Sequence, residues 1–176
     1  MVNFGVQAVI LSLIAVRSVF GSACADTDLI RYVDENGNDT ASCLNSSDPS
    51  LNPCRTLTYA LLEEVVYGIL YDDTCNYTNT RSNLCVRLND GVYRTTGELQ
   101  VTNASNVTIE AVNVGQVTLQ CLRFPNNQTD QWDDLYFLCC NDITVRGIIF
   151  ERCGPYASDL YVQLTNGLTI EDCVFR

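Results

Sequence analysis

The sequence of 176 residues contains no histidine and no lysine, so its cationic side chains are all arginines, 10 in number. Without histidine, the chain lacks a common ligand of zinc and the imidazole base that activates a serine or cysteine nucleophile. Acidic residues number 21, which gives a net charge of −11. Binding to nucleic acid or to an anionic membrane requires clustered basic side chains, so the sequence argues against both partners.

Long apolar segments are also missing, and no stretch reaches the roughly 20 apolar residues that a membrane-spanning helix requires. Ala8–Val16 is a mostly apolar run of nine residues, a length typical of the core of a signal peptide, although no arginine precedes it. Small residues at Ala23 and Ala25 allow cleavage after Ala25, and Gly21 with Ala23 allows cleavage after Ala23. We predict a signal peptide over residues 1–25, and hence a protein that is secreted or lies on the extracellular face of the cell surface.

Cysteine, by contrast, is abundant, with ten residues. Their spacings give no paired C-x-x-C motifs, so in an exported chain they indicate disulfides rather than a zinc site. Cys43–Cys54 and Cys75–Cys85 are the predicted pairs, because each closes a short loop. Cleavage after Ala25 would leave nine cysteines, whereas cleavage after Ala23 would keep Cys24 and an even number. The remaining disulfide candidates are Cys121, Cys139, Cys140, Cys153 and Cys173.

Two of these cysteines, Cys139 and Cys140, are adjacent in the sequence. Neighbouring side chains on a β-strand point to opposite faces. We therefore expect one of the two in the core and the other bonded elsewhere, with Cys121 or Cys153 as its partner.

Acceptor motifs for N-glycosylation occur six times, each without proline at the middle position. One such motif arises easily by chance. Six of them, in a chain with a predicted signal peptide and many cysteines, indicate a eukaryotic secretory route. The glycosylation candidates are Asn38, Asn45, Asn76, Asn103, Asn106 and Asn127.

The region before residue 84 contains a turn-rich stretch and then a helical pattern. Asp34–Pro53 is dense in Asn, Asp, Ser, Gly and Pro, the residues that favour turns. Apolar residues then recur every four positions, which predicts an amphipathic helix over Leu57–Tyr71. Thr56 is the expected N-cap, and Asp72 and Asp73 mark the end of the helix.

From Leu84 onward the pattern alternates as in β-strands and contains a repeat. An asparagine turn is followed by apolar-Thr-apolar-charged in three copies, whose central threonines are 36 and 25 positions apart. Asn suits such turns because it tolerates positive φ. A further apolar strand follows in the later copies, at Ile148–Phe150 and Cys173–Phe175. The three copies are Val107–Glu110, Ile143–Arg146 and Leu168–Glu171.

A repeat in the twenties matches one coil of a β-solenoid, in which each coil buries its apolar face only against its neighbours. The longer interval includes Phe124–Asp134, which we interpret as an insertion at a turn. Such insertions gather on one face of a solenoid, often the binding face. A sandwich of short strands is the alternative, but it gives no reason for repeating this strand after asparagine. The helix over residues 57–71 precedes the first coil, where an exposed sheet edge needs a cap.

The segment Tyr32–Leu62 contains Tyr-Val, then Asn-Gly-Asn-Asp, a Ser/Pro-rich loop, Pro-Cys-Arg-Thr-Leu and a short helix. It resembles the N-terminal part of right-handed parallel β-helix proteins of the pectin lyase-like superfamily. With the repeats, the resemblance covers most of residues 31–176. It implies the fold rather than an activity, because the segment occurs in polysaccharide lyases and epimerases and also in large non-enzymatic surface proteins. The Phe-x-x-Asn motif of bacterial polymorphic outer-membrane adhesins occurs only as Phe150-Glu-Arg-Cys153, so the chain departs from that group.

Candidates for catalysis are weak. Lyases of this fold need acidic calcium ligands and a base, and arginine is a poor general base because its pKa exceeds about 12. Arg146 is the best placed arginine, but a charge exposed on a strand is the simpler interpretation. The adjacent pairs Asp72-Asp73 and Asp133-Asp134 have no defined acid/base geometry. We assign no catalytic, cofactor-binding or metal residue, and Asp133-Asp134 is only a candidate for calcium.

The predicted fold is all-β, a right-handed parallel β-helix (solenoid) with an N-terminal amphipathic capping helix. Residues 26–83 form the lead-in segment and the capping helix, and residues 84–176 form the coils. The hypothesis is a non-catalytic extracellular segment in adhesion to or recognition of a glycan or protein. Trp132, in the insertion, is a candidate contact, and packing against the coil is its alternative role. The alternative function is the N-terminal part of a polysaccharide lyase or hydrolase whose catalytic residues lie beyond residue 176.

The last residues, Ile170–Arg176, follow a strand pattern without a helix or polar segment to cover the final coil. Solenoids need terminal caps for solubility. We therefore expect truncation at the C-terminus, with further β-helix coils or a partner on the open end. Residues 26–176 alone are expected to be poorly soluble or oligomeric.

Overall fold

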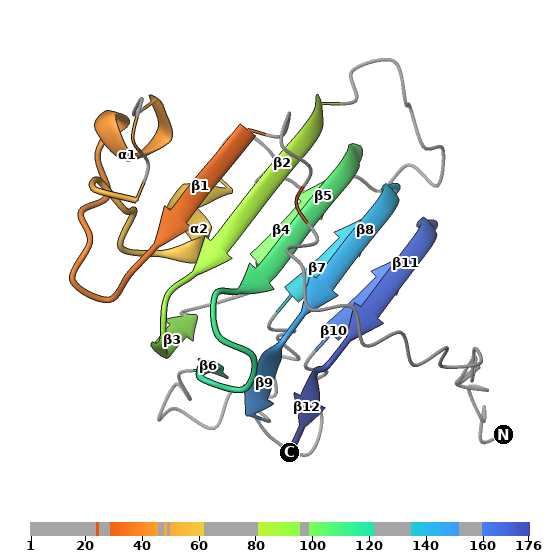
Figure 1. Ribbon diagram of the computed structural model, residues 1–176. Helices are drawn as coiled ribbons and strands as arrows, with labels where there is room; N and C mark the ends of the chain where they lie inside the picture. Colours follow the sequence, from red (N-terminus) through yellow and green to blue (C-terminus); the bar gives the residue numbers. More distant parts are fainter. Residues whose placement is uncertain are drawn as a thin grey trace, which may run out of the picture.

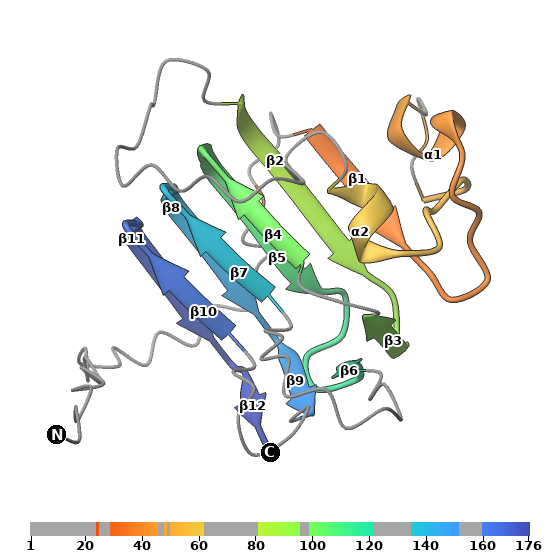
Figure 2. The same cartoon turned by 180° about the vertical axis from the view of Figure 1, so that it is seen from behind.

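The computed structural model describes residues 24, 29–45, 48, 50–61, 81–95, 99–121, 135–151 and 160–176. Within these ranges the chain consists mostly of parallel strands in three stacked sheets (Figure 1 and Figure 2). The predicted all-β class is therefore confirmed, and the arrangement is compatible with a β-helix-like solenoid.

The largest sheet, here called sheet A, has five strands in the order β1-β2-β5-β8-β11, and every neighbouring pair is parallel. Aliphatic residues alternate with polar ones along these strands, which buries one face and leaves the other outward. The strands are β1 (Leu29–Val33), β2 (Arg81–Leu88), β5 (Ala104–Ala111), β8 (Asn141–Arg146) and β11 (Asn166–Glu171).

The other two sheets are shorter, and the chain visits the three sheets in turn. From β2 onward, successive strands join sheets A, B and C, and the next strand returns to sheet A beside the previous one. We call each such set a rung; rungs 1 to 4 begin at β2, β5, β8 and β11. Sheet B consists of β3 (Gly91–Thr95), β6 (Val117–Cys121), β9 (Ile148–Glu151) and β12 (Val174–Phe175), and sheet C of β4 (Leu99–Thr102), β7 (Leu135–Leu138) and β10 (Leu160–Gln163).

The repeat found in the sequence sets the register of sheet A. Thr108 pairs with Thr144, and Thr144 pairs with Thr169, so the three copies of the pattern lie side by side. The predicted strands over residues 107–110, 143–146 and 168–171 are thereby confirmed. The insertion predicted over Phe124–Asp134 falls between β6 and β7 and lies outside the described residues.

The core is built from the inward-facing residues of successive rungs. Val86, Ile109 and Val145 are aligned across sheet A and are fully buried. Phe137 of sheet C and Phe150 of sheet B are buried among them. Burying an aliphatic or aromatic side chain of this size contributes about 1.5–3 kcal/mol. Each rung gains this contribution only from the rungs next to it, so the stack is the unit of stability.

A bend near the start of each later strand of sheet A requires left-handed backbone. This was predicted for the turn at Asn106, but in the two later copies the left-handed residue is the one after the predicted Asn141 and Asn166. Asn83, Asn106 and Asp142 have φ of 67°, 54° and 52°. The side chains also connect rungs, because the Nδ2 atom of Asn106 donates to Oδ1 of Asn83 at 2.6 Å. In rung 4 the position is Gly167, which has a φ of 73° and where a Cβ atom would lie 2.5 Å from Oδ1 of Asp142.

Two short helices lie against β1 (Figure 1). α1 (Ala41–Asn45) falls in the stretch predicted to be irregular, and α2 (Leu57–Ala60) begins at Thr56, whose Oγ1 accepts from the Tyr59 N–H at 3.1 Å. The N-cap prediction is confirmed. Among the described residues α2 ends at Ala60, short of the predicted helix over 57–71, and residues 62–80 lie outside them. The buried Arg31 of β1 donates to the Ala60 carbonyl at 2.5 Å, which supplies a partner that the end of a helix lacks.

The segment around α1 is fixed to residues 54–56 at several points. Cys43 of α1 forms the predicted disulfide with Cys54. The carboxylate of Asp39 accepts from the backbone N–H groups of Arg55 at 2.8 Å and Thr56 at 3.0 Å. Gly37 passes so close to Cys54 that a Cβ atom there would lie 2.4 Å from its carbonyl oxygen. Glycine is therefore required at this position.

Candidate functional site

The outer face of sheet A carries a row of polar residues in which the sign of the charge alternates. The row follows the strand register, so each residue sits beside its neighbour one rung away. Opposite charges facing each other across neighbouring strands stabilise the pairing, whereas like charges oppose it. We call these residues the charge row: Tyr32, Arg87, Glu110, Arg146 and Glu171.

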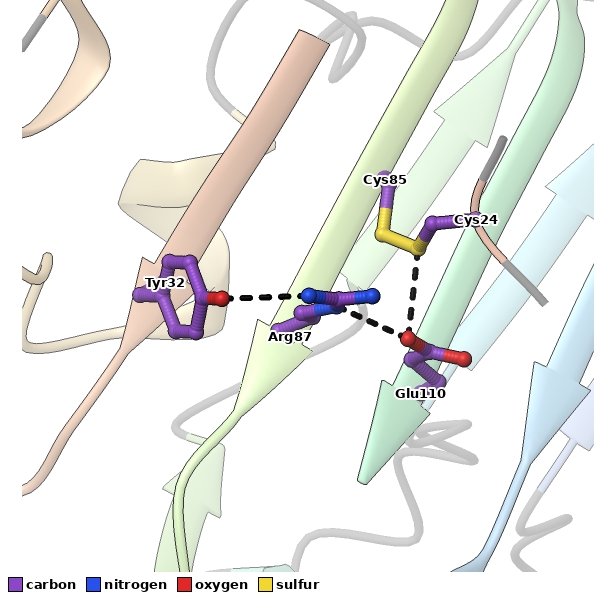
Figure 3. A network of polar contacts seen from close by, with 5 residues as sticks. All are labelled: Cys24, Tyr32, Cys85, Arg87 and Glu110. Carbon is purple, nitrogen blue, oxygen red and sulfur yellow. Dashed lines mark hydrogen bonds and ion pairs between the residues drawn. A yellow bond between two sulfur atoms is a disulfide. The ribbon is translucent and has the colours of Figure 1, made fainter. Parts of the chain in front are cut away.

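The first half of the charge row forms a compact polar network (Figure 3). Arg87 Nε donates to Glu110 Oε1 at 2.9 Å, and Arg87 Nη1 donates to Tyr32 Oη at 3.1 Å. The Glu110 side chain is only 5% exposed, so removing Arg87 would leave a buried carboxylate without this cation. Loss of one partner from such a pair costs about 3–5 kcal/mol.

Arg87 stays charged within this network. Burial acts to lower the pKa of Arg87, but the hydrogen bonds to Tyr32 and Glu110 outweigh it and raise the pKa above its usual value. The guanidinium group also lies near the Tyr32 ring, with its central carbon 5.9 Å from the ring centroid. A permanent cation held in this way orients a buried carboxylate but does not exchange protons at physiological pH.

The second half of the charge row lies on rungs 3 and 4, where Glu171 is far more exposed than Glu110, at 43% against 5%. Arg146 Nε lies 3.8 Å from Glu171 Oε2 and 3.7 Å from Asp172 Oδ2. Thr144 is partly buried, and Thr169 is exposed. This part of sheet A therefore presents two hydroxyl groups and both signs of charge. Arg146, the best placed arginine for catalysis, forms ion pairs with Glu171 and Asp172, and its side chain is only 15% exposed rather than exposed as expected.

A disulfide lies on the outer face of sheet A beside the buried ion pair (Figure 3). Cys24 is bonded to Cys85, which corrects the predicted Cys75–Cys85 pair. The prediction favoured a short loop, whereas the fold directs Cys85 outward from β2 beneath Cys24, 61 positions earlier. Cys24 Sγ lies 3.3 Å from Glu110 Oε1. Cys75 lies outside the described residues.

Among the described residues, Cys24, Cys85 and Glu110 are the group whose ligand atoms lie close enough together to resemble a metal site. Ligand atoms of Cys24, Cys85 and Glu110 lie within 4.8 Å of one another. The two sulfurs are bonded to each other, however, and a cysteine binds zinc only as the thiolate, so they are not ligands. The calcium candidate Asp133-Asp134 lies outside the described residues.

Other candidates are placed differently from the sequence pattern. Cys140 is buried, and its Sγ atom lies 3.4 Å from the Val101 carbonyl oxygen. Cys139 is disulfide-bonded. The expectation that one of these two cysteines lies in the core and the other forms a disulfide is therefore confirmed. The two residues lie at a corner between β7 and β8 rather than on a strand, and Cys139 has a φ of 56°. Cys173 is a free thiol, so its disulfide candidacy is wrong. Trp132 lies outside the described residues.

The glycosylation candidates differ in exposure. Asn38, Asn45 and Asn106 are exposed, whereas Asn103 is partly buried at a bend. Asn76 and Asn127 lie outside the described residues. Exposure therefore favours the first three positions, although the Nδ2 atom of Asn106 donates to Asn83.

The sequence analysis did not predict that these charged residues form one row, although the sequence shows part of the pattern. Each copy of the repeat ends in a charged residue, and the signs at Glu110, Arg146 and Glu171 alternate. Arg87 also stands between two apolar residues, as an outward residue of a strand does. Tyr32 gave no such signal, because it precedes the repeat.

The fold and this face define an all-β protein of stacked parallel sheets, compatible with a β-helix-like solenoid. No protein-family model matches the chain, and no curated protein or solved structure matches it. The resemblance to the pectin lyase-like superfamily therefore stays a prediction. No helix of the described part has the length and apolar character needed to cross a membrane.

Proposed function

We propose that this chain is a secreted or cell-surface segment of a right-handed parallel β-helix, with α2 acting as its N-terminal cap. In this proposal it recognises an extracellular glycan or protein and catalyses no reaction. Two disulfides, Cys24–Cys85 and Cys43–Cys54, hint at an oxidising, extracellular environment. The cap is supported by the packing of α2 against β1 and β2.

The observation that carries the proposal is the second half of the charge row, together with the threonines beside it. Its residues project from β8 and β11, whose backbones are fixed by parallel pairing in register. Side chains held on a rigid sheet lose little conformational freedom when a ligand binds. Thr144 and Thr169 offer hydroxyl groups, and Arg146 and Glu171 offer both signs of charge, a combination that suits polar ligands.

A blocking substitution tests this surface. Thr144→Arg places a long side chain on the outer face of sheet A, and Thr118→Arg is the matched control on the outer face of sheet B. Both threonines are partly buried on central strands. The secreted chain is applied to a glycan array with neutral and acidic polysaccharides, and to cells before and after protease treatment. We expect Thr144→Arg to weaken binding by about tenfold or more, and Thr118→Arg to leave it unchanged.

The assay also separates the classes of ligand and of function. Array binding indicates a glycan, and cell binding lost after protease indicates a protein. Equal binding by the two variants would place the ligand surface elsewhere. Release of product from a uronide polymer with calcium present would contradict the non-catalytic part of the proposal and favour a polysaccharide lyase.

A further inference from the structure

Two cysteines and a glutamate lie together on the outer face of sheet A, at Cys24, Cys85 and Glu110 (Figure 3). Their sulfur and carboxylate oxygen atoms lie within 4.8 Å of one another, and Cys24 Sγ is 3.3 Å from Glu110 Oε1. The Cα atoms of the two cysteines are 5.7 Å apart. If the bond between the sulfurs is broken, two sulfur ligands and one oxygen ligand are within reach of a single metal ion.

The sheet holds two of these ligands in place independently of the disulfide. Cys85 and Glu110 project from β2 and β5, which pair in parallel register. Cys85 is fully buried, and Glu110 is 4% exposed. Arg87 Nε also donates to Glu110 Oε1 at 2.9 Å, which orients the carboxylate. A Cys24 thiol at its present distance would donate to Glu110 and so stay beside the other two ligands.

The charges around these residues balance when a divalent cation is bound. Two thiolates and the Glu110 carboxylate carry three negative charges, the cation supplies two positive charges, and Arg87 supplies the third. Balance matters here because an uncompensated charge at a buried position is costly. Arg87 therefore neutralises the loaded site while it keeps its hydrogen bond to Glu110.

We propose that Cys24, Cys85 and Glu110 form a redox-controlled binding site for Zn²⁺, the divalent cation that thiolate ligands suit best here. In the oxidised chain the sulfurs are bonded to each other, and the site does not bind metal. A dithiol reductant supplies two electrons and two protons, which convert the disulfide to two thiols while the reductant becomes a disulfide. Binding of Zn²⁺ then releases the two thiol protons to solvent.

The other disulfide, Cys43–Cys54, provides an internal control. Among the described residues, no aspartate or glutamate completes a group of three ligands with these two cysteines. Reduction of this pair therefore yields two thiols without a third ligand. We expect the pair to bind Zn²⁺ weakly, because a stable zinc site in a protein has at least three protein ligands.

Protection of individual cysteines tests the proposal. The intact chain is reduced with a water-soluble phosphine, freed of the phosphine and alkylated with and without Zn²⁺, and mass spectrometry follows each cysteine separately. We expect Zn²⁺ to slow alkylation of Cys24 and Cys85 by about tenfold or more at saturation, because the metal occupies the thiolates that would react. Cys43 and Cys54 should react at the same rate with and without Zn²⁺. Equal protection of the two pairs, or protection of neither, would overturn the proposal.

Matched variants test the oxygen ligand. Glu110→Gln removes the negative charge but retains an oxygen that can accept from Arg87, and we expect it to weaken Zn²⁺ binding by about tenfold or more. Glu151→Gln is the control, because Glu151 is a partly exposed glutamate on sheet B. It should leave Zn²⁺ binding unchanged. Equal binding by the two variants would overturn the assignment of Glu110 as a ligand.

Co²⁺ gives a second readout, which reports on the type of ligand. A four-coordinate Co²⁺ ion with thiolate ligands absorbs visible light, and Zn²⁺ displaces it because such sites bind Zn²⁺ more tightly. The reduced chain should gain this absorption and lose it when Zn²⁺ is added. Cys24→Ser should remove the absorption, whereas Cys43→Ser should preserve it. Absorption by the oxidised chain, or none by the reduced chain, would overturn the proposal.

Discussion

At the scale of single residues, Asp34 at the end of β1 shows how hydrogen bonds hold a charge in place. Asn89 Nδ2 donates to its carboxylate at 2.7 Å, and the Asn36 backbone N–H donates at 2.9 Å. The bond from Asn89 is the larger influence, and together these bonds lower the pKa of Asp34, while burial opposes them. A carboxylate with a lowered pKa stabilises the fold while it is ionised.

We predict that Asp34→Asn lowers stability in a pH-dependent manner. The pKa of Asp34 is lower when folded than when unfolded, so its contribution is complete above the unfolded value of about 3.9 and disappears as pH falls through the folded value. The stability difference from wild type should therefore be largest near neutral pH and shrink below about pH 4. Urea unfolding across this range measures it. Asp90→Asn, at an exposed carboxylate, is the control, and a difference that stays constant with pH would contradict the prediction.

The two disulfides should differ in their contribution to stability. Cys24–Cys85 closes a loop with a separation of 61 positions, whereas Cys43–Cys54 spans 11. If a disulfide stabilises by restricting the unfolded chain, removal of Cys24–Cys85 lowers the free energy of unfolding by about 4 kcal/mol, and removal of Cys43–Cys54 lowers it by about 3 kcal/mol. Replacing both cysteines of each pair with serine and comparing denaturant unfolding tests this order. A larger loss for Cys43–Cys54 would show that local anchoring of α1 outweighs loop length.

At the scale of elements, the stacked strands of sheet B share one aromatic position that changes from buried to exposed. Phe150 in β9 is fully buried, and Phe175 in β12 stacks on it with planes 5° apart but remains half exposed. The chemistry of the two side chains is identical. A comparison of the two residues therefore measures how much a covering rung contributes to the free energy of unfolding.

We predict that Phe150→Ala destabilises the chain by about 3–5 kcal/mol, because it leaves a cavity between neighbouring rungs. Phe175→Ala should cost only about 1 kcal/mol, because roughly half of its burial is already missing. Thermal or urea unfolding of the two variants provides the comparison. Equal losses would show that the open end is covered in solution by another copy.

At the scale of the whole molecule, the N-terminal cysteine connects processing with the fold. Cleavage of the predicted signal peptide after Ala25 would remove Cys24, which would leave Cys85 without its partner on the outer face of sheet A. Cleavage after Ala23 keeps the disulfide. The structure thus favours one of the two sites that the sequence leaves open.

We predict that the chain secreted from eukaryotic cells begins at Cys24. Mass spectrometry of the N-terminal peptide, with and without reduction, identifies the first residue and its link to Cys85. The Cys24→Ser variant is the control for the link. A secreted chain that begins at Asp26 and is folded would contradict this prediction.

The exposed strand edges of β11 and β12 also predict how residues 24–176 behave alone in solution. Exposed strand edges and apolar residues on rung 4 favour association without a fixed geometry. We expect a polypeptide of residues 24–176 to associate as its concentration rises. Sedimentation velocity measures this effect. A monodisperse monomer at high concentration would contradict the prediction.

Much of the fold was predictable because its signals are local. The apolar-Thr-apolar-charged pattern marks inward and outward residues within a few positions, and the bend at Asn106 needs left-handed backbone that asparagine tolerates. The cap at Thr56 was predictable for the same reason. The Cys75–Cys85 pair was not, because closing a short loop says nothing about which distant cysteine the fold places above Cys85.

The sequence by itself determined the period of the strands, the residues that face the core and the signs of the outward charges. Only the tertiary structure decided which of those charges meet. Arg87 and Glu110 are 23 positions apart, whereas the next steps of the charge row span 36 and 25 positions. Because connections of unequal length separate the strands, spacing alone does not align one rung with the next. Parallel backbone pairing and burial of the inward residues do so.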